Sequence, residues 1–186
     1  SINGLLYIRG HRSDFDHWRQ LGCRGWSFED VLPYFVRSED QERGGNDLHG
    51  FGGPLGVSNM RIEREICQRF IDAAAAIGVP RNDDFNGAEQ DGVGYFQVTT
   101  RNGLRCSTAA GYLRPARRRS NLAVVTDAHA KRVIVENGRA VGVVYAHFGR
   151  ERIARTAGEV IISAGAIGSP QLLMLSGIGP PEHLAD

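Results

Sequence analysis

The chain has 186 residues, of which 41% are hydrophobic and 23% charged, and its 22 Lys and Arg against 21 Asp and Glu give a net charge of +1. This composition is typical of a globular protein and excludes a disordered chain, a coiled coil or a collagen-like repeat. The balanced charge argues against a surface for nucleic acid or anionic membranes. No window approaches about 18 consecutive apolar residues, so no transmembrane segment is predicted.

Glycine is unusually frequent, with 24 residues. Such an excess suits tight turns and close approach of the backbone to a ligand. Cys23, Cys67 and Cys106 are far apart and form no Cys-x-x-Cys pair. We therefore expect reduced thiols and a cytoplasmic location. The chain has no initiator Met and begins as if in the middle of an element, so we expect it to be an internal fragment.

The first expected element is a short helix capped by Ser27, with apolar positions at Val31, Leu32 and Phe35. Its length is limited by the next segment, 39–56, which is rich in glycine and contains a proline. Such residues interrupt regular structure, so this segment is predicted to be loop throughout.

An amphipathic helix is predicted over residues 60–77, because apolar residues recur there at helical spacing. Gly78 stands where a helix commonly ends, and Pro80 prevents its continuation. The apolar stripe consists of Ile62, Ile66, Phe70, Ile71, Ala74 and Ile77. The next expected elements are a loop over 82–94, a strand over Tyr95–Thr100 and a short helix near 107–114.

From Leu122 the pattern changes to strands, with Asn137-Gly138 as the turn of a hairpin. The short apolar run Val160–Ile162 suits a strand buried on both faces. Ser169 and Pro170 are then expected to open a helix that ends at Gly177. The remaining predicted strands are Leu122–Thr126, Lys131–Glu136, Ala140–His147 and 151–156.

Few motifs point to chemistry from residue type and spacing alone. The strand, glycine-rich turn and helix at 160–176 could present backbone amides to a phosphate or a polarised ring. Close packing of the helix on the strand explains these glycines equally simply, and we favour it. The arginines at 114 and 117–119 could contact phosphates, but we favour a solvated helix end.

No metal site is predicted. The six histidines form no ligand spacing of a known type. Asp14, Asp16 and His17 are better explained as an exposed helical or loop face than as ligands. Neither Ser163 nor Ser176 stands in the Gly-x-Ser-x-Gly context of a nucleophilic serine. These patterns alone indicate an α/β chain with some capacity to bind a ligand.

The order of several longer motifs gives a stronger indication. The stretch from Gly158 to Pro180, GEVIISAGAIGSPQLLMLSGIGP, closely resembles the second signature of the glucose–methanol–choline (GMC) oxidoreductases. The residues SING at 1–4 and YIRG at 7–10 resemble the end of the first signature. Between them lie DFDHW at 14–18, GW at 25–26, LPYF at 32–35, HG at 49–50, GP at 53–54, GLRCS at 103–107, YL at 112–113, NL at 121–122 and AVGV at 140–143. The resemblance covers the whole chain and is greatest for the choline-dehydrogenase-like branch.

The resemblance implies an α/β fold, with part of a Rossmann-like FAD-binding domain, antiparallel strands and a piece of the substrate domain. Residues 1–59 would be an FAD-domain segment with a lid-like extension. Residues 60–100 would belong to the substrate domain, and residues 101–186 would return to the FAD domain. The Gly-x-Gly-x-x-Gly motif that holds the FAD pyrophosphate, and the catalytic His of the family, have no counterpart in this sequence.

The resemblance also implies which residues bind the cofactor. It places Ser1, Asn3, Gly4, Leu5 and Leu6 along the isoalloxazine and ribityl chain, although packing alone would also explain both leucines. Ala130 matches a position whose backbone pairs with adenine, and Ala164 and Gly165 are expected to face the cofactor. Where some relatives carry a His that bonds to flavin, this chain has Ile2, so FAD is expected to be non-covalent.

The function implied is that of a fragment of an FAD-dependent alcohol oxidoreductase, in which hydride passes from an alcohol carbon to flavin N5. The expected partner is a small-molecule alcohol. The isolated chain is expected to be inactive and to self-associate. The alternative is a non-catalytic fragment or an interaction domain.

Overall fold

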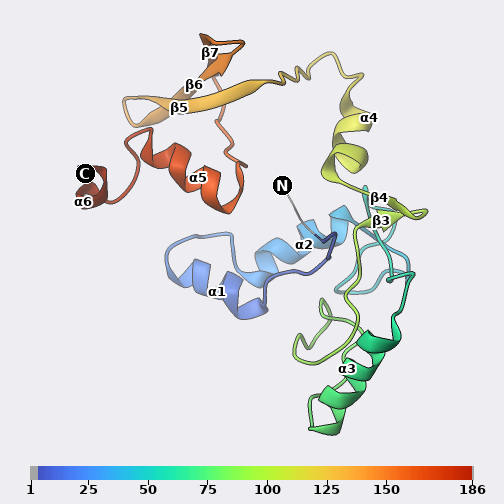
Figure 1. The fold of residues 1–186 in the computed structure, drawn as a ribbon. Coiled ribbons are helices and arrows are strands. Elements are labelled where there is room, and N and C mark those ends of the chain that lie inside the picture. The colour runs from blue at the N-terminus through green and yellow to red at the C-terminus, as the bar shows by residue number, and fades with distance from the viewer. Residues whose placement is uncertain (1–3, 186) are drawn as a thin grey trace. The chain divides into compact units, whose positions relative to one another are not determined.

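A computed structural model describes residues 4–185 of the chain (Figure 1). The predicted Ser1 and Asn3 lie outside these residues, as does Ile2. The chain divides into two compact units. Unit 1 ends at Leu122 and unit 2 begins at Ala123. Both mix helices with short strands, and unit 2 contains an antiparallel sheet, as expected for the predicted fold class.

Unit 1 begins with two helices that meet through aromatic side chains. Helix α1 (Arg12–Gln20) was not predicted, because its N-cap is His11, whose ring accepts a hydrogen bond from the Ser13 amide. Helix α2 (Phe28–Ser38) has the predicted Ser27 cap. Asp30 completes that cap by accepting from the Ser27 amide at 3.0 Å. Phe15 of α1 is buried, and its ring contacts those of Trp18, Phe28 and Phe35.

The segment 39–56, predicted to be loop throughout, contains paired strands. Strand β1 (Glu39–Gln41) lies parallel to β2 (Leu55–Val57), with Glu39 opposite Leu55. The prediction failed because both strands are short and the glycine-rich loop between them hides the pairing. Two glycines of that loop pack directly on backbone, since a Cβ at Gly50 would overlap the carbonyl of Val36 and one at Gly53 that of Glu39.

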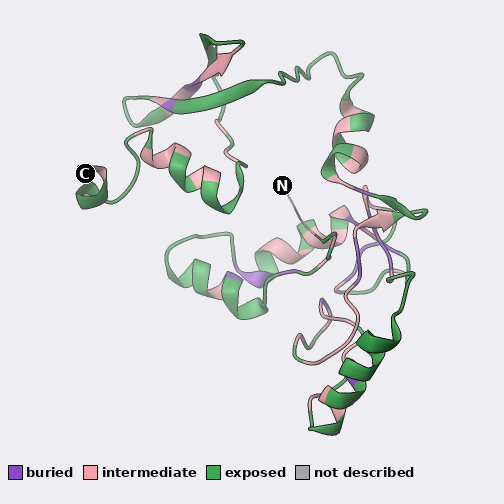
Figure 2. Ribbon diagram, viewed as in Figure 1, coloured by how far each residue is buried: buried purple, intermediate pink, exposed green. Residues whose placement is uncertain are grey.

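Helix α3 (Glu65–Ala76) begins later than predicted, so Ile62 precedes it. Gly78 follows its C-cap at φ 96°, as the predicted helix end requires. Only Ile71 of the predicted apolar stripe is buried. Figure 2 shows α3 as mostly exposed, and the exposed members are Ile62, Ile66, Phe70 and Ile77.

The predicted strand Tyr95–Thr100 is not continuous: Val98 forms only isolated bridges, and Thr100 belongs to the next short strand. Val98 bridges to both Leu6 and Ser58, and so ties the N-terminal segment to the end of β2. The hairpin of β3 (Thr100–Arg101) and β4 (Leu104–Arg105) follows. The helix predicted near 107–114 is a π-helical turn, Ala109–Leu113, continued by α4 (Arg114–Ala116).

Unit 2 is built on a three-stranded antiparallel sheet in the order β5-β6-β7. The strands are β5 (Ala128–Glu136), β6 (Arg139–His147) and β7 (Arg150–Arg155). Asn137 and Gly138 both have positive φ, which confirms the predicted hairpin turn. The predicted strand over Leu122–Thr126 is wrong: the residues before β5 have no strand partner in the described part of the chain.

Helix α5 (Gly165–Met174) packs against β5. Just after the helix, Ser176 Oγ accepts a hydrogen bond from the Val133 amide of β5 at 2.8 Å. The helix starts four residues before the predicted cap, so Ser169 and Pro170 lie inside it. The Ser169 hydroxyl instead accepts from the Ala164 amide at 3.0 Å. Helix α6 (Pro181–Leu184) follows. None of the described helices is both long enough and apolar enough to span a membrane.

The predicted buried strand Val160–Ile162 is also wrong. These residues form neither strand nor helix, and Ile161 is 82% exposed. An apolar run becomes a buried strand only where neighbouring strands satisfy its backbone groups. The described residues of this chain supply no such neighbour to 160–162.

Candidate functional site

The predicted cofactor segment at 4–6 is held to residues 97–99 by hydrogen bonds. The Tyr7 amide donates to the Gln97 carbonyl at 2.8 Å. The Leu5 carbonyl accepts from the Thr99 amide at 2.8 Å and from the Thr99 hydroxyl at 3.2 Å. Gly4 and Leu6 are exposed. The backbone is therefore fixed while these residues remain accessible.

Leu5 has a backbone conformation that is rare for its residue type, with φ 66°. Among the other described non-glycine residues with positive φ, Asn102, Asn137 and Phe148 each precede a glycine in a tight turn between strands, and Asp127 lies directly before β5. No such turn explains Leu5. Strained residues of this kind tend to occur where a site needs a particular backbone orientation.

Directly after this segment, Arg9 enters a buried ionic cluster that the sequence analysis did not identify. The Arg9 side chain is 3% exposed and Glu39 is fully buried. Arg9 Nη2 donates to Glu39 Oε2 at 2.8 Å, and Nη1 donates to the Leu48 carbonyl at 2.7 Å. The Gly50 amide also donates to Glu39 Oε2, at 3.0 Å. The cluster thus joins the N-terminal segment to β1 and to the loop after it.

His49 links this ion pair to a second carboxylate. Its Nδ1 lies 3.1 Å from both oxygens of Glu39, and its Nε2 lies 2.9 Å from Asp84 Oδ2. The hydrogen bond to Glu39 raises the pKa of His49, and the charges of Glu39 and Asp84 add to this, while burial opposes it. Only the protonated ring can donate to both carboxylates at once.

Buried amides complete the cluster. The Gln41 and Gln97 side chains each donate to the other at 2.8 Å. Gln97 also donates to Asn59 Oδ1, and Gln41 to Glu39. Because Gln97 also accepts from Tyr7 through its carbonyl, this network supports the same backbone that carries Leu5.

The other predicted cofactor residues lie in unit 2. Ala130 is exposed on β5, which has only one neighbouring strand among the described residues. A register shift lies between Ala130 and Arg132. Ala164 is the N-cap of α5, and Gly165 has φ 85° with open space where a Cβ would stand. These backbone groups are accessible, as contact with a cofactor requires.

The structure brings Gly4, Leu5 and Leu6 together in unit 1 and places Ala130, Ala164 and Gly165 in unit 2. It adds the Arg9, Glu39 and His49 cluster, for which the only signals were the YIRG and HG motifs. Asp14 and Asp16 serve as helix-cap acceptors, from His11 N and Phe28 N. In the described residues, no group of three or more potential ligands is arranged for a metal ion.

The whole chain is similar to known oxidoreductases. A family model described as GMC oxidoreductase matches residues 1–186. Oxygen-dependent choline dehydrogenases of Sinorhizobium fredii (strain NBRC 101917 / NGR234) and Brucella ovis are each 44% identical over the whole chain, which covers 34% of each relative. The chain therefore spans about a third of the length of these relatives.

Two solved structures are also similar. One is pyridoxine 4-oxidase from Mesorbium loti, with a TM-score of 0.86 and 34% identity over 98% of this chain and 36% of that one. The other is an FAD-dependent oxidoreductase from Chaetomium thermophilum, with a TM-score of 0.83 and 25% identity over 99% of this chain and 34% of that one.

We predict that Glu39→Gln destabilises unit 1 by about 3–5 kcal/mol, because it leaves the buried Arg9 charge without its counter-ion. Urea unfolding would measure the change. Glu29→Gln is the matched control, since Glu29 pairs with Arg12 at the surface and its loss should cost about 1 kcal/mol or less. Equal effects of the two substitutions would contradict the buried role of Glu39.

We also predict that His49 makes the stability of unit 1 depend on pH. Its pKa is raised in the folded state, so its contribution is complete below the unfolded pKa of about 6.5 and is lost as pH rises through the folded pKa. Urea midpoints should fall from pH 6 upward, and the fall should be smaller in His49→Gln. Parallel pH profiles for the two proteins would exclude this role.

Proposed function

Because this chain belongs to the GMC oxidoreductase family, we propose that it forms part of an FAD-dependent alcohol oxidoreductase of the choline-dehydrogenase type. The observation that carries the proposal is the 44% identity to oxygen-dependent choline dehydrogenases across all 186 residues. Since the chain spans 34% of those relatives, the reaction is assigned to a protein of their full length. Residues 1–59 and 101–186 would belong to its FAD domain, and 60–100 to its substrate domain.

The residues of this chain fit an FAD site. Gly4 is exposed, and a Cβ there would meet nothing closer than Leu6 Cγ at 3.7 Å, so a flat ring could approach the backbone. Gly165 is equally open, and one side of β5 carries no partner strand in the described residues. These features support backbone contacts to the isoalloxazine at 4–6, to adenine at Ala130 and to the cofactor at Ala164 and Gly165. Ser1 and Asn3 would complete the flavin contacts.

The role of this chain in the reaction is to bind and orient. When bound, FAD supplies the hydride acceptor, N5, for a C–H bond of the alcohol, while the hydroxyl proton leaves to a base. In this chain, Thr99 and the Arg9–Glu39–His49 cluster would hold the backbone of residues 4–6 in place. Fixed backbone donors stabilise charge on a bound ring without reorganisation during the reaction. The substrate class we propose is a small alcohol, as the names of the relatives suggest.

The compartment we propose is the cytoplasm. Cys23, Cys67 and Cys106 are all free thiols in the structure, as predicted. Two of them, Cys23 and Cys67, are exposed. Exposed free thiols are typical of proteins kept in a reducing environment.

We predict that a protein of the relatives' full length carrying this sequence purifies with FAD and that choline reduces the flavin under anaerobic conditions. Acid denaturation should release all the flavin, since Ile2 cannot bond to it. Asn3→Ala should weaken flavin binding by about 1–3 kcal/mol through loss of a donor. The absorption spectrum measures each outcome. A colourless protein would refute the proposed function, whereas flavin left in the precipitate would refute only non-covalent binding.

The alternative, a non-catalytic interaction domain, is favoured by one observation. Large apolar side chains of α3 are exposed, including Ile66 at 72% and Phe70 at 69%. Contiguous apolar surface of this kind promotes association. We therefore predict that the isolated chain, without flavin, self-associates through α3 in gel filtration and that Phe70→Asp shifts it toward monomer. A wild-type monomer at micromolar concentration would contradict this.

A further inference from the structure

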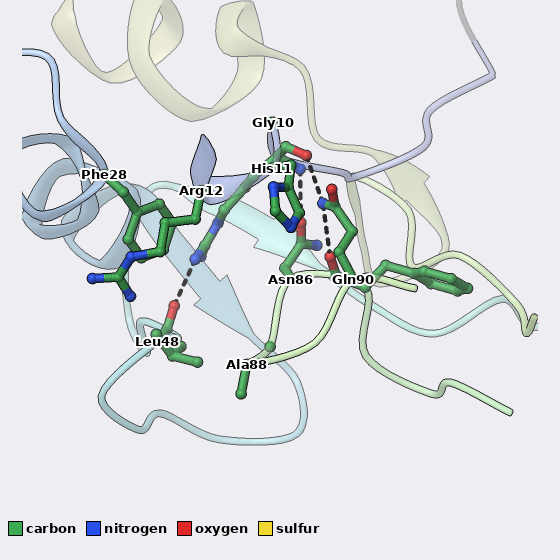
Figure 3. A pocket seen from close by; sticks show the side chains of 11 residues that line it. Gly10, His11, Arg12, Phe28, Leu48, Asn86, Ala88 and Gln90 are labelled. Atoms are coloured by element: carbon green, nitrogen blue, oxygen red, sulfur yellow. Dashed lines mark hydrogen bonds between the residues drawn. The ribbon is translucent and has the colours of Figure 1, made fainter. Parts of the chain in front are cut away.

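A cavity of about 220 Å³ lies in unit 1, apart from residues 4–6 (Figure 3). Its walls come from residues 9–12 at the start of α1, from Phe28 at the start of α2, from Leu48 and from the 85–90 loop. A water molecule occupies about 30 Å³ in the liquid, so the space could hold about seven waters or one small organic ligand. Nothing in the proposed flavin chemistry uses it.

The lining combines apolar and cationic groups. Phe28, Leu48 and Phe85 provide apolar surface. Arg9 and Arg12 provide guanidinium groups, and the described residues that line the cavity include no Asp or Glu. Such a lining favours a ligand with an apolar body and one negative charge.

Arg9 forms part of this wall, but its side chain is committed to the core. It is held by Glu39 and by the Leu48 carbonyl, as described above. Its Nε, however, is the one buried side-chain nitrogen or oxygen without a hydrogen-bond partner in the described part of the chain. Because that nitrogen is buried, it is closed to a ligand, and Arg9 contributes a fixed positive charge rather than a free donor.

One further donor at the same cavity, Arg12, is not committed to the core. Arg12 lies over the Phe28 ring, 4.8 Å from its centroid, and pairs with Glu29 at the surface. Because such exposed pairs are worth about 0–1 kcal/mol, a ligand carboxylate can replace Glu29 on Arg12.

We propose that this cavity binds a small organic carboxylate, with its apolar body against Phe28, Leu48 and Phe85 and its carboxylate at Arg12. The planar guanidinium of Arg12 matches a carboxylate with two parallel hydrogen bonds. Inorganic phosphate fits less well, because it has no apolar part to cover the three hydrophobic side chains. The site does not depend on the flavin function.

The test uses the 186-residue chain and benzoate as the probe, with benzyl alcohol as its neutral analogue and inorganic phosphate as the anion without an apolar body. Calorimetric titration should show benzoate binding at least about tenfold more tightly than either. NMR should place the perturbed amides at 9–12 and 85–90. Equal binding of benzoate and benzyl alcohol, preferential binding of phosphate, or no benzoate binding at millimolar concentration would overturn the proposal.

Three variants locate the site. Arg12→Gln should weaken benzoate binding about tenfold or more, because a charge-assisted pair is lost. Glu29→Gln is the matched control and should leave the affinity equal or higher, since it removes a competitor for Arg12. Ala88→Leu should block the cavity, with urea midpoints verifying that each variant is folded. Unchanged affinity in both Arg12→Gln and Ala88→Leu would overturn the assignment to this cavity.

Discussion

The ion pair between Arg9 and Glu39 is the interaction on which unit 1 depends. Both side chains are almost fully removed from water, and Glu39 receives hydrogen bonds from three separate parts of the chain. A buried charge is tolerated only when it is paired and its remaining lone pairs are satisfied. Glu39 therefore requires the N-terminal segment, β1 and the loop before Gly50 to occupy one arrangement.

This requirement explains the packing around the cluster. Gly50 and Gly53 bring their backbones against the end of α2 and against β1, at distances that no side chain would permit. The close approach lets the Gly50 amide reach Glu39 and sets His49 between Glu39 and Asp84. Residues 4–6 are thus connected to this charged cluster only indirectly, through the Tyr7–Gln97 hydrogen bond, while Leu6 itself bridges to the buried Val98.

Local signals in the sequence predicted local structure well. The Ser27 cap, the Gly78 helix end and the Asn137-Gly138 turn each depend on a few adjacent residues, and all three are confirmed. The strand predicted at Val160–Ile162 failed because strand formation also needs partners that the apolar run itself does not contain. The cluster was missed for a related reason: Arg9 and Glu39 are 30 residues apart, and no spacing motif joins them.

The two arginines near the start of α1 show how burial divides charged groups into different roles. Arg9 is buried, so removing Glu39 would leave the guanidinium charge unpaired and away from water. The Arg9 side chain is therefore held in one geometry. Arg12 is three residues away but more than half exposed, so its pair with Glu29 exchanges readily with water or another anion. One arginine can therefore only support structure, while the other is available to bind. The cavity is lined by both arginines. Arg9 gives it a fixed positive charge, and Arg12 gives it a guanidinium that can exchange Glu29 for the carboxylate of a ligand.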